Sequence, residues 1–159
     1  MKKFKFKLEK VLVHRQILAD LAQKSFAEAK AQMDAETDEL NAMIGMKTGA
    51  LEQRARAIES TTDWANSVAQ INQYVTGQDQ RIKNQTLRLQ KTENLVEARR
   101  EILREAVSEV KILERLEEKQ KQTYMAEAAK VEQAEMDELT VIRFSRNESL
   151  IKGSHDDGI

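Results

Sequence analysis

The sequence predicts an all-α protein in which two long helices form an antiparallel coiled-coil hairpin. The chain has 159 residues with no Pro, only five Gly and 33% charged residues. This composition is typical of long helices rather than of a layered α/β core. Apolar residues recur at helical spacing along two long stretches, and a cluster of hydroxyl and acidic residues separates them. These observations favour a single hairpin over residues 1–146.

The first helix is expected at about residues 4–58, because one stripe of apolar residues persists along that stretch. The stripe has a mean step of about 3.6 residues, which keeps it on one face of a nearly straight helix. The KFKFK opening is interpreted as the frayed first turn of this helix, with its lysines in solvent. The stripe comprises Phe4, Leu8, Val11, Arg15, Leu18, Ala22, Phe26, Ala29, Met33, Thr37, Leu40, Ile44, Lys47, Leu51, Ala55 and Ile58.

A chain reversal is expected at about residues 59–63, where the sequence reads ESTTD. Hydroxyl and acidic residues compete with the helical backbone and cap new helices well, so Thr62 or Asp63 should be the N-cap of the second helix. That helix is expected over residues 64–146, with an apolar stripe whose mean step is about 3.5 residues, the heptad value. Residues 147–159 are expected to form a flexible tail.

Two stripes joined by a short connection are most simply buried against each other in an antiparallel hairpin. The second helix is the longer one, so either it overhangs or residues 64–86 fold over the tip as a short helix, with a break near Gly77. The sequence leaves this choice and the register open. Charged residues interrupt the stripes, so we expect a marginally stable hairpin that associates with partners. The interrupting charged residues are Arg15, Lys47, Glu93, Arg100 and Glu135.

Composition argues against several classes of function. The formal net charge of -1 provides no general attraction for nucleic acid. Without Cys there is no disulfide or thiolate metal site, and the absence of a long apolar run or a signal-peptide pattern predicts a soluble chain with no direct membrane insertion. His14 and His155 lie near opposite ends of the chain, and no phosphate-loop or hydrolase motif occurs. We therefore expect no enzyme and no cofactor.

Three segments resemble the FliJ family, the small coiled-coil component of the bacterial flagellar type III export apparatus. They are FKFKLEKVLVHRQ, WANSVAQINQYV and LEEKQKQTYMAEAAKVEQAEMDELTVIRF. The resemblance spans nearly the whole chain and implies a non-catalytic stalk that binds the hexameric export ATPase ring and promotes its assembly and activity. It also implies contacts with the cytoplasmic domain of the export gate and with export chaperones, at the cytoplasmic face of the inner membrane at the flagellar base.

The resemblance assigns two contact surfaces. The surface facing the ATPase ring would comprise Lys2, Lys3, Phe4, Lys5, Lys7, Leu8, Lys10, Asp137, Glu138, Arg143 and Phe144. The surface facing the export gate would comprise Glu39, Met43, Met46, Ala50, Tyr74, Gln78, Arg81 and Gln85.

Other interpretations remain open from the sequence. The main alternative is a helical-hairpin chaperone or scaffold unrelated to an ATPase ring, and a third is a basic hairpin that binds RNA or a membrane. The sequence also leaves open whether a stalk rotates, which chaperones it meets, whether it serves a flagellum or an injection machine, and its oligomeric state.

Overall fold

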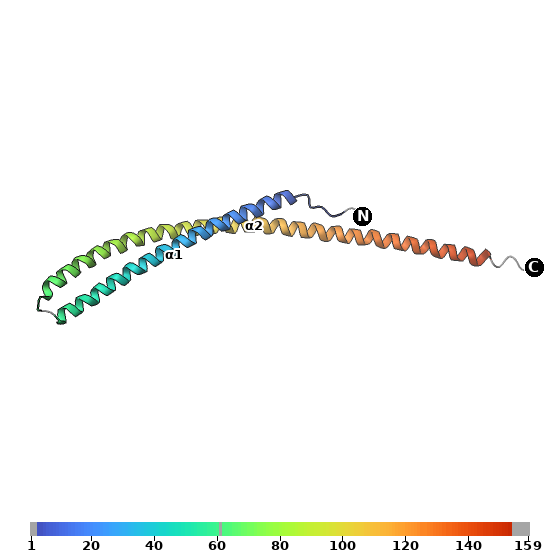
Figure 1. The fold of residues 1–159 in the computed structure, drawn as a ribbon. Coiled ribbons are helices and arrows are strands. Elements are labelled where there is room, and N and C mark those ends of the chain that lie inside the picture. The colour runs from blue at the N-terminus through green and yellow to red at the C-terminus, as the bar shows by residue number, and fades with distance from the viewer. Residues whose placement is uncertain (1–2, 61, 154–159) are drawn as a thin grey trace, which may run out of the picture. The chain divides into compact units, whose positions relative to one another are not determined.

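Two long helices make up the protein. A computed structural model describes the backbone of residues 3–60 and 62–153, and the side chains of residues 3–59 and 62–148. The helices are α1 (Glu9–Ser60) and α2 (Trp64–Gly153), with no strand among the residues described (Figure 1). The predicted all-α helical hairpin is confirmed. Contacts divide the chain into a turn unit, His14–Glu109, and a terminal unit that combines Met1–Val13 with Val110–Ile159.

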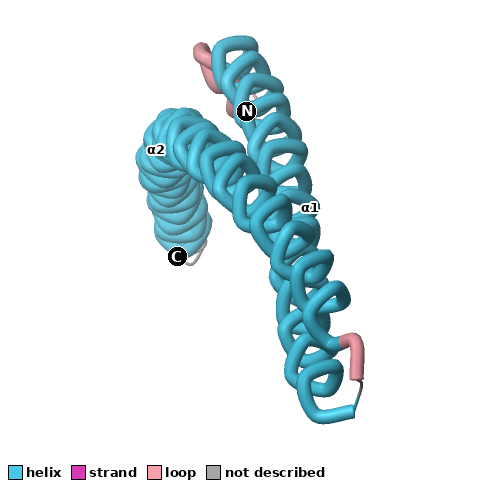
Figure 2. The backbone as a smooth tube through the Cα atoms, turned by 90° about the vertical axis from the view of Figure 1, so that its left-hand side faces the viewer, coloured by secondary structure: helices cyan, strands magenta, loops and turns pink. Residues whose placement is uncertain are grey.

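In the turn unit, α1 and α2 run antiparallel on either side of a short connection that includes Thr62 and Asp63 (Figures 1 and 2). Most of the buried and half-buried residues of α1 fall into two series with steps of seven residues. This is the heptad pattern of a coiled-coil seam. One series is Ala22, Ala29, Glu36, Met43, Ala50 and Ala57, and the other is Ala19, Phe26, Met33, Leu40, Lys47 and Arg54.

The α2 side of the seam also follows heptads. One series is apolar: Val68, Val75, Ile82, Leu89, Val96 and Leu103. The other series begins with Ile71 and continues through Gln78, Gln85 and Thr92, which are the buried polar residues of the described chain. The α1 seam contains many alanines, and their small side chains leave room for these polar groups between the helices.

The predicted stripe of α1 was wrong in register at several positions. Leu18, Ile44 and Ile58 are exposed, and their neighbours Ala19, Met43 and Ala57 are half-buried instead. In a heptad coiled coil the seam repeats every 3.5 residues, so a stripe with a step of about 3.6 residues drifts away from the partner helix.

The charged residues expected to interrupt the seam behave in two ways. Arg15 and Lys47 are half-buried in it, and their charged ends pair with Glu109 and Asp79 of α2, each at 2.5 Å. Glu93, Arg100 and Glu135 are exposed, so the prediction was wrong for these three. Arg100 forms an ion pair with Glu97 and lies over the Phe26 ring, 5.8 Å from its centroid.

The second helix is continuous from Trp64 to Gly153. Residues 64–86 belong to this helix and face α1 in the turn unit, so the break considered near Gly77 does not occur. The helix also continues past residue 146, so residues 147–153 of the expected tail are helical, and residues 154–159 lie outside the described residues. The excess length of α2 is thus at its C-terminal end, where every residue from 129 to 148 is exposed.

In the terminal unit, the KFKFK opening is not helical, and its interpretation as a frayed helical turn was wrong. α1 begins at Glu9, and the Leu8 carbonyl accepts a hydrogen bond from the Leu12 N–H at 2.9 Å. Phe6 is 4% exposed, and the Phe4 ring centroid lies 5.7 Å from that of Tyr124. The alternation of exposed Lys with covered Phe follows a period of two, which suits a non-helical segment laid along α2.

Candidate protein-interaction surfaces

The candidate functional features of the described chain are accessible surfaces on its two helices. No group of three or more His, Cys, Asp or Glu residues within it could hold a metal ion. Of the two histidines, His14 is exposed and His155 lies outside the described residues. Within the described residues, neither helix has a stretch that is long and apolar enough to span a bilayer.

The predicted ring-facing lysines surround an apolar hollow in the terminal unit. Lys3, Lys5 and Lys7 are exposed and line it together with Phe4. Leu116, Tyr124 and Glu127 are among its lining residues on α2. Within the described residues these three lysines form no ion pair, so their charges are available to an acidic partner. Lys10 and Leu8 are also exposed, and Lys2 lies outside the described residues.

The remaining ring-facing candidates lie further along α2 in the same unit. Asp137, Glu138, Arg143 and Phe144 are all exposed, and Phe144 is 73% exposed. Glu132, which precedes them, lines a second hollow with Lys3 and Phe4. The predicted ring-facing residues that the structure describes all belong to the terminal unit, and all of them are exposed except the half-buried Phe4.

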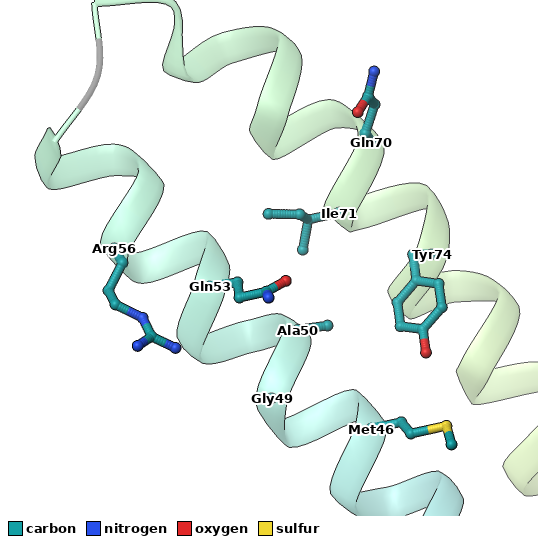
Figure 3. Close-up of a pocket in the computed structure, with 8 residues that line it drawn as sticks. All are labelled: Met46, Gly49, Ala50, Gln53, Arg56, Gln70, Ile71 and Tyr74. Atoms are coloured by element: carbon teal, nitrogen blue, oxygen red, sulfur yellow. The ribbon is translucent and has the colours of Figure 1, made fainter.

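A groove lies between α1 and α2 near the turn, and it includes three of the predicted gate-facing residues. Met46 and Tyr74 are 56% and 46% exposed, and their side chains approach each other from opposite helices (Figure 3). Ala50 is buried between the helices. The groove has a volume of about 510 Å³ and is lined by Met46, Gly49, Ala50, Gln53, Arg56, Gln70, Ile71 and Tyr74.

Gln78 supports this groove from inside the seam. Its Nε2 donates a hydrogen bond to the Tyr74 hydroxyl at 2.7 Å and lies 3.9 Å from the Met46 sulfur. Its Oε1 is buried and has no hydrogen-bond partner. A buried amide that bonds both exposed residues restricts their rotamers, so Tyr74 and Met46 are presented in a defined arrangement.

The eight predicted gate-facing residues separate into two groups. Glu39, Met46, Tyr74 and Arg81 are exposed and can reach a partner, whereas Met43, Ala50, Gln78 and Gln85 are half-buried or buried in the seam. Gln85 donates hydrogen bonds to the Glu36 carbonyl oxygen at 3.1 Å and to its carboxylate at 2.5 Å.

Sequence reasoning missed five residues that line the groove: Gly49, Gln53, Arg56, Gln70 and Ile71. A signal existed for Ile71, because it lies seven residues before Gln78 and therefore occupies the same heptad position.

A two-helix hairpin with charged and apolar surfaces, and without a metal-binding cluster in its described part, defines a class of helical interaction proteins. Comparison with family models narrows this class. The model described as flagellar FliJ protein matches residues 4–149, so the chain belongs to the FliJ family. It is thus a component of a type III protein export apparatus, and the family is non-catalytic.

Among solved structures, the chain is similar to one described as a candidate YscO homologue, CT670 from Chlamydia trachomatis. The two are 18% identical, the match covers 97% of this chain and 100% of the other, and the TM-score is 0.43. The comparison with curated proteins finds no match.

Proposed function

We propose that this protein is a non-catalytic stalk of the flagellar export apparatus, which binds the hexameric export ATPase ring through its terminal unit. The observation that carries the proposal is the family match over residues 4–149. The exposed, unpaired lysines around the Phe4 hollow support it, because they form a basic surface with an apolar centre. Such a surface fits acidic and apolar groups on a partner.

The stalk acts on hydrolysis without supplying a reacting group. A protein that binds the assembled ring but not its separated subunits shifts the population toward the ring, and turnover rises for that reason alone. Asp137, Glu138, Arg143 and Phe144 would extend the contact along α2. Export chaperones are further proposed partners, with no contact residues assigned to them.

The groove beside the turn is the proposed contact for the cytoplasmic domain of the export gate. Tyr74 and Met46 supply exposed apolar area, and Glu39 and Arg81 supply charge at accessible positions. Tyrosines are common anchors in protein interfaces, especially when their rotamer is held before binding. These contacts would place the protein in the cytoplasm, peripherally associated with the inner membrane at the flagellar base.

The ring contact is tested by measuring hydrolysis by the export ATPase at a low enzyme concentration, where ring assembly limits the rate. Intact protein should raise turnover, and the triple variant Lys3→Glu, Lys5→Glu, Lys7→Glu should not. A matched variant reverses the exposed Lys24, Lys30 and Lys83 of the turn unit and should still stimulate. If intact protein leaves turnover unchanged while rings are shown to form from ATPase alone, the stalk function is wrong and a chaperone or scaffold becomes the better explanation.

The gate contact is tested separately, by calorimetric titration with the soluble domain of the gate. Tyr74→Ala should weaken binding by roughly tenfold or more, as expected for an interface anchor. Ile17→Ala removes an equally exposed apolar side chain elsewhere in the turn unit and should leave binding unchanged. Equal affinities for the two variants would exclude the groove as the contact.

A further inference from the structure

The end of α2 carries apolar residues that no other described residue covers. Every residue from 129 to 148 is exposed, although Leu139 and Ile142 lie on one helical face and Met136 flanks it. A helix without tertiary packing is only marginally stable in water, and most helices gain their stability by burying an apolar face. We therefore expect residues 129–148 to gain stability by pairing with a partner.

Charge along the same face indicates which partner fits. Glu132 and Glu135 lie before Leu139, whereas Arg143 and Arg146 lie after it, at spacings of three and four residues that keep all five on one side of the helix. Glu132, Glu135 and Arg143 form no ion pair within the described part of the chain. The face is thus acidic in its first half and basic in its second, with Leu139 near the middle.

We propose that two copies of this protein associate through Glu132–Arg146, antiparallel, with Leu139 near the two-fold axis. An antiparallel arrangement sets the acidic half of each copy against the basic half of the other, and it brings the apolar residues near Leu139 together. A parallel arrangement would set like charges against each other. The contact is short, so the association is weak and depends on protein concentration.

The association has a consequence that rests on the proposed function. The paired face includes Arg143, which is assigned there to the ATPase ring, whereas Asp137 and Phe144 lie on the other side of α2. A dimer would cover Arg143, so ring binding and self-association would compete for this residue. Copies that are not bound to a ring would then dimerise at high protein concentration, and rings without a bound copy would dissociate the dimers by binding single chains.

The first experiment measures molar mass by light scattering over a concentration series of the full chain, and it needs no ATPase. The mass should rise from 18.2 kDa toward twice that value. Leu139→Glu should keep it at the monomer value with unchanged helicity, because Leu139 is already 53% exposed in the single chain. Ile17→Glu, at an equally exposed site in the turn unit, should leave the rise unchanged. A monomer mass throughout, or a dimer that survives Leu139→Glu, would overturn the proposal.

Charge exchange tests the pairing of the two halves. Arg143→Glu makes one copy's face more acidic, and Glu132→Arg with Glu135→Arg makes the other copy's face basic. Each variant alone should associate less than the intact protein, whereas an equal mixture of the two should form a mixed dimer. If the mixture remains monomeric while the intact protein dimerises, the assigned pairing is wrong.

Disulfide formation tests the direction, because the chain has no cysteine of its own. Under mild oxidation Leu139→Cys should link to itself. Glu132→Cys should link poorly to itself but readily to Arg146→Cys, since these positions lie on the paired face at equal distances on either side of residue 139. Efficient self-linkage of Glu132→Cys would indicate a parallel pair and contradict the proposal.

Discussion

Gln78 donates a hydrogen bond from its side-chain Nε2 to the hydroxyl of Tyr74, over 2.7 Å. Gln78 is only 2% exposed, and Tyr74 stands at the edge of the groove beside the turn. The seam is therefore connected to the proposed gate surface by a polar residue. The same residue leaves its carboxamide oxygen without a partner, which is unfavourable for a buried polar atom. Gln78 consequently lowers the stability of the hairpin while it holds the Tyr74 side chain in place for binding.

Gln78→Leu should stabilise the hairpin by about 1–2 kcal/mol, because it removes an unsatisfied buried oxygen and adds apolar burial. The same change releases the Tyr74 hydroxyl and should weaken binding of the gate domain. Urea unfolding followed by circular dichroism measures the stability. Gln85→Leu is the comparison, since the Gln85 Nε2 bonds Glu36 in two ways and the gain there should be smaller. A larger gain at Gln85 than at Gln78 would contradict the argument.

Ala29→Leu should destabilise the hairpin by roughly 1–3 kcal/mol, the usual effect of forcing extra methylenes into a packed interface. Ala29 is buried in the seam, with only 4% of its surface exposed. Ala35→Leu adds the same atoms at an exposed position of α1 and should leave the unfolding midpoint nearly unchanged. Equal midpoints for the two variants would mean that Ala29 is not in the seam.

Phe6→Ala should loosen the terminal unit and leave the turn unit intact. Removal of a buried Phe from a core typically costs about 3–5 kcal/mol, and here the loss falls on the few residues that pack with it. Hydrogen exchange resolved by residue should show faster exchange in the start of α1, Glu9–Val13, with unchanged rates in His14–Glu109. Lys5→Ala, at an exposed neighbour, should change neither. Equal acceleration in both units would show that Phe6 supports the whole hairpin.

The ion pair between Arg15 and Glu109 should contribute little to stability. The charged groups are 2.5 Å apart, but their side chains are 40% and 49% exposed. Pairs this exposed contribute about 0.2–1 kcal/mol, and salt screens them. A double-mutant cycle of Arg15→Gln and Glu109→Gln should give a coupling energy in that range that declines in high salt. A coupling of several kcal/mol, insensitive to salt, would disprove this estimate.

Part of the proposed gate surface could be predicted from the sequence, and part could not. The resemblance indicated Met46, Ala50 and Tyr74, which line one groove. It assigned Gln78 and Gln85 to the same surface, although both are buried in the seam. Gln residues are usually exposed, and only the partner helix decides that these two are not. The role of Gln78 as the support of Tyr74 therefore required the structure.

Local chemistry along the chain determined the two helices, the position of the turn and the absence of a layered core. Helical propensity, hydroxyl and acidic residues before Trp64, and the lack of Pro act between near neighbours, so the sequence expresses them directly. The tertiary structure decided the seam register, the non-helical start and the exposed end of α2. Whether Phe6, Ala19 or Gln78 is buried depends on the path of a second helix many residues away, and a shift of one residue turns a helical side chain by about 100°.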